Sequence, residues 1–161
     1  MTTFPGLLHT FLIGFVSGLR SMTAPAVVSW AARLGWIDLS KTPLAFLGYA
    51  ATPYIISFLA VAELIADKLP MTPSRKAPAG FTARIVLGAF SGCALSLGIG
   101  QSGVTGAVLG CLGAVAGTLG GYKARTSLVS ALRVPDILIA LLEDALAIGV
   151  GLFVVHHNQP M

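Results

Sequence analysis

The run PDILIALLEDALAIGVGLFVV, Pro135–Val155, holds two adjacent carboxylates, Glu143 and Asp144, within 21 mostly apolar residues. Glu143 lies eight residues after Pro135, so a helix would carry it about 12 Å along its axis. A bilayer hydrocarbon core is about 30 Å thick, which puts the pair near mid-depth. An acid at that depth costs at least about 3 kcal/mol on insertion scales. The fold must therefore provide partners for these two side chains.

The composition is that of a membrane protein. The chain has 161 residues, of which 55% are hydrophobic and 10% charged, and its mean hydropathy is +0.87. Soluble domains carry about 25% charged residues. Sixteen formal charges cannot cover such a surface, so we predict an all-α, polytopic transmembrane helical bundle forming one domain over residues 1–161. Residues 1–20 have no basic stretch before the first apolar run, which favours a first span over a cleavable signal peptide.

Six apolar segments predict about six spans. They are Phe4–Leu19, Ala24–Leu34, Leu44–Ala66, Phe81–Ile99, Val104–Gly121 and Pro135–Val155. The second has about eleven residues, so it either crosses as a short tilted span or re-enters on the same side. Pro53 predicts a kink in the third. Gly106, Gly110, Gly113 and Gly117 share one face of the fifth, which is typical of close packing against a neighbouring helix.

The basic residues indicate the orientation. Six spans would place eight of them on one side: Arg20, Lys68, Arg75, Lys76, Arg84, Lys123, Arg125 and Arg133. Arg33 and Lys41 would lie on the other side. If the second segment is re-entrant, seven basic residues would lie on one side of the membrane and three on the other. The positive-inside rule then predicts that the connections 68–84 and 122–134 are cytoplasmic. It also accounts for the net charge of +4, so no nucleic-acid partner is expected.

The two halves of the chain show similar polar stretches. Gly18–Ser21 and Ala62–Asp67 in the first half correspond to Lys123–Ser127 and Leu142–Ala145 in the second. Three elements per half would give an inverted repeat, as in many transporters. However, 43 residues separate Arg20 from Glu63, against 18 between Arg125 and Glu143, so chance similarity stays open.

The same stretches carry a family resemblance. They read Ser17-Gly18-Leu19-Arg20-Ser21, Glu63 through Asp67-Lys68-Leu69-Pro70, Lys123-Ala124-Arg125 and Leu142-Glu143-Asp144-Ala145. Over roughly residues 14–150 the chain resembles a family of small bacterial inner-membrane proteins known only as a domain of unknown function. The resemblance implies a multi-pass location in that membrane, and it implies no mechanism.

Eight ionisable residues form the candidate substrate- or ion-binding site. They are Arg20, Glu63, Asp67, Arg84, Lys123, Arg125, Glu143 and Asp144. Adjacent helical residues point about 100° apart, so Glu143 and Asp144 should not both face one partner. We expect one of them to pair with an arginine of a neighbouring span and the other to face a polar cavity.

Three functions fit these residues. A buried ionic network would fix helix register without other activity. A polar pathway would let a carboxylate bind a cation or exchange a proton, whereas Arg20 and Arg125 could instead bind an anion or a lipid phosphate. An embedded lipid enzyme would use Glu63 or Glu143 as general base, but the sequence holds no familiar catalytic motif.

We therefore expect a small transporter or channel-like protein for a small solute or ion, with a structural or lipid-binding scaffold as the alternative. We expect no enzymatic activity, no catalytic residue, no cofactor and no metal, since Cys93 and Cys111 lie in apolar spans and His156 and His157 in a polar tail. The expected partners are the lipid bilayer, a small solute, ion or lipid headgroup, and further copies of the chain, since so short a chain encloses little volume.

Overall fold

The computed structural model describes residues 3–68 and 78–158, which form six α-helices and one short 3₁₀ helix, with no strand among them. The helices are α1 (Thr3–Leu19), α2 (Thr23–Arg33), η1 (Ala45–Gly48), α3 (Thr52–Ala66), α4 (Pro78–Gly98), α5 (Gly103–Leu132) and α6 (Asp136–His157). α4, α5 and α6 are long and apolar enough to cross a membrane. The all-α membrane-type bundle is therefore confirmed. Six full spans are not, because α1 and α3 are apolar but shorter and α2 has only 11 residues. The single domain stays a prediction.

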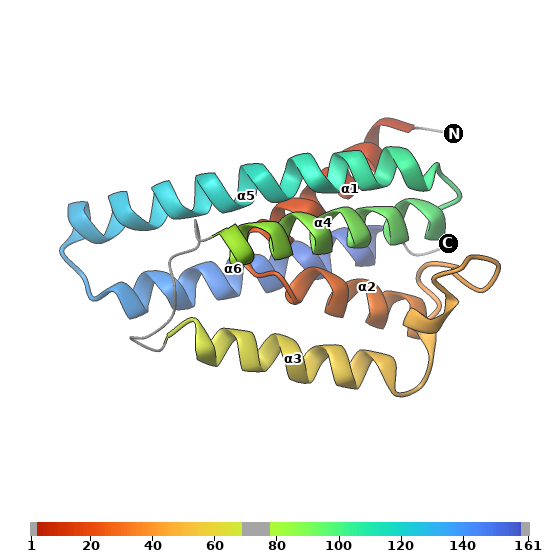
Figure 1. Cartoon of the computed structure of the whole chain (residues 1–161), viewed down its shortest axis with the longest axis horizontal. Coiled ribbons are helices and arrows are strands. Elements are labelled where there is room, and N and C mark those ends of the chain that lie inside the picture. Colours follow the sequence, from red (N-terminus) through yellow and green to blue (C-terminus); the bar gives the residue numbers. More distant parts are fainter. Residues whose placement is uncertain (1–2, 69–77, 159–161) are drawn as a thin grey trace.

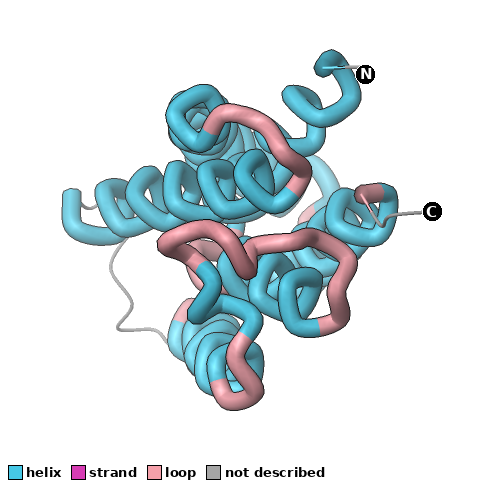
Figure 2. Tube along the Cα trace, turned by 90° about the vertical axis from the view of Figure 1, so that its right-hand side faces the viewer, coloured by secondary structure: helices cyan, strands magenta, loops and turns pink. Residues whose placement is uncertain are grey.

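Successive helices run in alternating directions along one axis (Figure 1). Both termini and the connections 34–51 and 99–102 lie at one end of the bundle, here called the loop end. Figure 2 looks onto this end. The α5–α6 turn lies at the opposite end, here called the hairpin end, and α4 begins on that side of the bundle, several turns short of the α5–α6 turn (Figure 1). Arg33 and Lys41 belong to the loop end, whereas Arg20 and Arg84 are buried within the bundle, and the predicted orientation in the membrane stays a prediction.

The chain turns back between α1 and α2 inside the bundle. α1 is about 25 Å long and α2 about 16 Å, and α2 returns toward the loop end (Figure 1). Eight of the 11 residues of α2 are buried, with Val28 and Ser29 completely so. Irregular backbone at membrane depth is tolerated only where protein or a water-filled cavity surrounds it. The reversal at Arg20–Met22 is such a place, and it favours the re-entrant interpretation of the second segment.

α5 packs on α1 and α4 through glycines, as the sequence predicts. A methyl group at Gly110 would collide with the Gly88 carbonyl of α4. At Gly113 it would lie 2.8 Å from the Phe15 nitrogen of α1. Apolar side chains gain little by leaving lipid for another helix, so this close main-chain approach carries much of the association.

Two predicted boundaries are wrong. Pro53 lies in the first turn of α3, where proline is favoured, so it begins a helix and does not kink one. α5 continues through the predicted connection 122–134 as far as Leu132, because good helix formers such as Ala124, Leu128 and Ala131 follow its glycines. Arg133, at φ 52°, then ends the helix in the left-handed region.

The remaining differences concern the chain on either side of α4 and the C-terminal end of α6. α4 begins at Pro78, so Arg84 lies in its second turn, whereas Arg75 and Lys76 lie outside the described residues. His156 and His157 form the last turn of α6 and not a polar tail. Their rings lie 5.7 Å from Trp36 and 5.1 Å from His9, respectively, centre to centre.

Candidate functional site

The reversal between α1 and α2 is stabilised by a carboxylate from α3. Glu63 accepts hydrogen bonds from the backbone nitrogens of Ser21 (2.8 Å) and Met22 (2.7 Å) and from the Ser21 hydroxyl (2.5 Å). These N–H groups precede the first turn of α2, where a negative charge is favoured by the helix dipole. On the α1 side, the Gly18 carbonyl accepts from Thr118 Oγ1 at 3.1 Å. The polar groups of the turn thus find partners within the protein.

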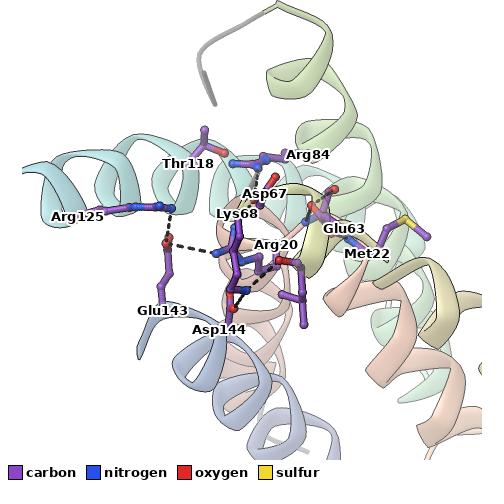
Figure 3. Close-up of polar contacts among 12 residues, drawn as sticks. Arg20, Met22, Glu63, Asp67, Lys68, Arg84, Thr118, Arg125, Glu143 and Asp144 are labelled. Carbon is purple, nitrogen blue, oxygen red and sulfur yellow. Dashed lines mark hydrogen bonds and ion pairs between the residues drawn. The ribbon is translucent and has the colours of Figure 1, made fainter. Parts of the chain in front are cut away.

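Arg20 lies at the centre of the site and is completely buried (Figure 3). Its Nε donates to Asp144 Oδ1 at 2.5 Å, and its Nη1 donates to Asp67 Oδ2. Its Nη2 lies 3.9 Å from Glu143 Oε2. One guanidinium therefore joins the start of α2 to the end of α3 and to the second turn of α6.

Further ion pairs extend this contact into a cluster (Figure 3). Arg84 Nη2 lies 3.6 Å from Asp67 and Lys68 Nζ 2.6 Å from Asp144, while Arg125 Nη1 lies 3.9 Å from Glu143. We call the set the ion cluster, and it comprises Arg20, Asp67, Lys68, Arg84, Arg125, Glu143 and Asp144. With Glu63 it contains four basic and four acidic groups, so its formal charge is zero.

The ion cluster lies inside the bundle. Arg84 is 14 residues from the loop end of α4 and Glu143 is 14 residues from the loop end of α6, or about 21 Å in each case. Only six and seven residues, about 10 Å of helix, separate them from the starts of α4 and α6. If the loop end lies at one membrane surface, the cluster lies about two-thirds of the way through a 30 Å core.

One donor in the cluster is unsatisfied. Arg20 Nη2 is buried and has no hydrogen-bond acceptor among residues 3–68 and 78–158, since its 3.9 Å separation from Glu143 is too long for a hydrogen bond. A buried polar group without a partner costs about 1–3 kcal/mol, and more when it is charged. Such a group calls for a functional or structural explanation.

A groove of about 370 Å³ reaches Glu143 from the outside of the bundle. Its walls come from α1, α5 and α6 and are almost entirely apolar, apart from Glu143 and Arg125. The predicted cavity next to one of the two acids thus exists, but its polarity was predicted wrongly. It resembles a lipid-facing surface more than a water-filled path.

The structure brings together seven of the eight predicted site residues. Lys123 is the exception, because it is exposed and takes part in no ion pair among the described residues. The prediction that Glu143 and Asp144 cannot share a partner is wrong, since different edges of the Arg20 guanidinium reach both of them. Among the described residues, no group of three or more His, Cys, Asp or Glu is arranged to hold a metal ion.

Four contributing residues were not predicted: Ser21, Lys68, Thr118 and Asp136. Lys68 follows Asp67 directly, within a stretch that carries the family resemblance, and this proximity was the available signal. Asp136 lies in the first turn of α6, where an acid is common for its effect on the helix dipole, and its Oδ1 accepts from Arg125 Nε at 2.7 Å. Thr118 follows the predicted glycine face, and the sequence offers no signal for its bond to Gly18.

The family model described as "Domain of unknown function (DUF4126)" matches residues 7–159. The chain belongs to this family. The match includes the reversal, Glu63 and every residue of the ion cluster, and it confirms the resemblance to an uncharacterised family. No curated protein and no solved structure matches the chain.

Proposed function

We propose that this DUF4126 protein is a small membrane transport protein that binds a small solute or ion at the ion cluster. The observation that carries the proposal is the unsatisfied, fully buried Nη2 of Arg20 beside a re-entrant turn. A ligand oxygen at Nη2 would supply the missing acceptor. Transport proteins commonly build their sites around interrupted helices at membrane depth, with charged side chains facing the bundle interior.

The ion pairs suggest how such a site could open. Asp67 contacts both Arg20 and Arg84, and Asp144 contacts both Arg20 and Lys68, so each carboxylate has two basic partners. Protonation of either acid, or arrival of a ligand, would leave the basic groups free to exchange partners. α3 supplies Asp67 and Lys68 from the edge of the bundle, so its hairpin end is the part that we propose moves.

The orientation and assembly belong to the same proposal. We propose that the hairpin end faces the cytoplasm, and the excess of Lys and Arg toward that end supports this orientation through the positive-inside rule. We propose the bacterial inner membrane as the location, and a homo-oligomer, because one small bundle encloses little space. We propose no enzymatic activity: of the two candidate bases, Glu63 is engaged by the N–H groups of the reversal and Glu143 lies 3.9 Å from both Arg20 and Arg125.

Flux measurements in proteoliposomes test the proposal. The probes are protons, sodium, potassium, chloride and phosphate, with the purified protein compared with Glu143→Gln and Asp144→Asn. We expect the parent to conduct at least one probe and each variant to lose most of that flux while it still reconstitutes as a helical protein by circular dichroism. A parent that conducts none of the five, or variants that conduct as well as the parent, would overturn it.

A scaffold is the second candidate, favoured by the apolar walls of the groove at Glu143 and by the zero formal charge of the cluster with Glu63. In that case the two variants would lose stability and the parent would show no flux. An embedded lipid enzyme would instead turn over a lipid in detergent micelles, where no sealed compartment exists.

A further inference from the structure

All three histidines of the chain lie where the last turn of α6 meets the rest of the loop end. The ring of His157 lies edge-on to that of His9 in α1, with centres 5.1 Å apart. The ring of His156 lies edge-on to Trp36 at 5.7 Å. His9 is only 6% exposed, whereas the other two histidines are exposed. The last turn of α6 is therefore held between α1 and the connection 34–51.

Asn158, the residue that follows α6, connects His9 to this turn. Its amide nitrogen donates to the Val154 carbonyl at 2.7 Å and lies 3.1 Å from His9 Nδ1. The Val154 carbonyl is one of the last four of the helix, which find no acceptor role within the helix itself. An amide nitrogen carries two N–H groups, so it can donate to both atoms when His9 Nδ1 carries no proton. The arrangement therefore fits a neutral His9 ring with its proton on Nε2.

A proton on His9 Nδ1 would disturb these bonds. Two donors would then face each other across 3.1 Å, and the nearest acceptor, the Asn158 side-chain oxygen, lies 3.4 Å away, beyond the usual range. Exchanging the positions of the amide nitrogen and oxygen would give up the bond to Val154. Charge on both His9 and His157 would also place two like charges about 5.1 Å apart. Histidine ordinarily changes its charge between about pH 5 and 8, so mild acid would produce both effects.

No acid among residues 3–68 and 78–158 compensates the two rings. The other titratable side chains toward the loop end are Arg33, Asp38, Lys41, Tyr49 and Cys93, and none of them is in hydrogen-bond, ion-pair or ring contact with a histidine. The Asp38 carboxylate accepts from Ser40 instead. α1 and the loop-end halves of α5 and α6 carry no charged side chain apart from the histidines. The terminal charges belong to residues 1 and 161, outside the described ranges.

We propose that His9, His157 and Asn158 form an acid-sensitive latch that holds the last turn of α6 on α1. The latch is closed while His9 is neutral, and protonation of His9 opens it. Val154 and Val155 are buried, so the opening is confined to residues 156–158. Trp36 and Asn158 also line a hollow of about 360 Å³ at the loop end, whose shape would change when the turn is released. The latch goes beyond the proposed transport function and does not depend on it.

NMR of the protein in detergent micelles, titrated from pH 7.5 to 5, tests the proposal. The labelled histidine rings report which ring gains a proton. Hydrogen exchange of the backbone amides of residues 156–158 reports the opening, expressed as protection relative to an unstructured peptide at the same pH. We expect this protection to fall about tenfold in the step in which His9 gains its proton. Amides in the middle of α6, such as that of Ala147, should keep their protection.

Matched variants separate the latch from a general effect of acid. His9→Gln should reduce the fall in protection to less than about twofold, because no charge can form at this position. His157→Gln removes only the repulsion between the rings, so it should lessen the fall, and it replaces His9→Gln if that variant fails to fold. His156→Gln is the control and should respond as the parent does, because its ring contacts Trp36 and not His9.

Three results would overturn the latch. The first is a His9 ring that stays neutral down to pH 5, and the second is a His9 ring that gains its proton without any loss of protection at residues 156–158. The third is a tenfold fall that persists in His9→Gln or, in its place, in His157→Gln. No flux is measured, so a protein that transports none of the probes could still show the latch, and the reverse also holds.

Discussion

α5 and α3 are both apolar helices of one bundle, yet they are held in different ways. α5 lies between α1 and α4 along most of its length, with main chain against main chain at its glycines. α3 lies at the edge of the bundle in both views (Figures 1 and 2), and only Pro53 and Ala60 are buried within it. Phe58 and Ile65 face outward at 73% and 61% exposure. Its charged contacts gather at its C-terminal end, and in its middle Ser57 accepts a hydrogen bond from Trp30 Nε1 at 2.9 Å.

The difference follows from the solvent. In lipid, moving an apolar side chain from solvent to a neighbouring helix gives little free energy, so helices associate through close packing or through polar contacts. α5 uses the first means and α3 the second, through Glu63, Asp67 and Lys68. The position of α3 should therefore depend on charge, and that of α5 on side-chain volume.

Arg20→Met should have the largest effect, because it removes the basic group on which α3 and α6 converge. Asp67 and Asp144 would each lose a partner in a buried setting, which costs about 3–5 kcal/mol. Chemical unfolding in detergent micelles, followed by circular dichroism, measures the loss. Arg33→Met, an exposed change at the loop end, is the control and should shift stability by less than about 0.5 kcal/mol. Equal stability of Arg20→Met and the parent would mean that the cluster does not hold α3.

Gly110→Ala tests the other half of the comparison. The new methyl group would meet the Gly88 carbonyl of α4, so the helices must separate, at a cost of about 1–3 kcal/mol. Gly149→Ala has open space and should instead stabilise the helix by about 0.5–1 kcal/mol. The same unfolding measurement compares the two. If both alanine variants changed the free energy of unfolding in the same direction, close main-chain packing would not be what holds α5 in place.

The sequence predicts what is periodic or compositional in this molecule. Hydropathy located all six helices, and the spacing of Gly106, Gly110, Gly113 and Gly117 predicted the packing of α5. The boundary at Gly121 was placed too early, because Lys123 and Arg125 suggested a polar connection although their long side chains suit an exposed helix. Pro53 was misinterpreted because proline both kinks and begins helices, and hydropathy does not distinguish the two.

The sequence predicted most of the residues of the site but not how they are arranged. Intramembrane charges are rare enough that Arg20, Glu63, Asp67 and Glu143 could be selected from sequence alone. What sequence could not supply is the reversal at Arg20–Met22. The role of Glu63 depends on N–H groups that become available only when α1 ends inside the bundle. The proposed repeat would make Glu63 and Glu143 equivalent, but Glu63 lies in the last turn of α3 and Glu143 in the second turn of α6. The inverted repeat stays a prediction without support from these positions.

Glu63→Gln tests the difference between α3 and α5. It weakens the polar contacts of α3 but leaves no cavity, because glutamine has nearly the same volume as glutamate. The amide oxygen can still accept a hydrogen bond but lacks the charge, so we expect a loss of about 1 kcal/mol. Hydrogen–deuterium exchange should rise in the last turns of α3 and at Ser21 and Met22, while the glycine region of α5 exchanges as in the parent. Exchange that rises equally in α3 and α5 would mean that the two helices open together and would remove the distinction.

The smallest effect concerns Asp38, an exposed carboxylate at the loop end. It takes part neither in the glycine packing of α5 nor in the polar contacts of α3. The hydroxyl and then the backbone N–H of Ser40 donate to it, at 2.6 and 2.9 Å, and these bonds lower the pKa of Asp38 below its usual 3.8. Its charged form is favoured in the fold, so its contribution is complete above the unfolded pKa and disappears as pH falls through the lower folded pKa. Ser40→Ala should raise the pKa of Asp38 in a carbon-detected NMR titration and lower stability by a small amount that stays constant between about pH 5 and 8 and disappears at acid pH, where Asp38 is protonated. If Asp38 of the parent titrates at or above 3.8, the turn does not stabilise its charge.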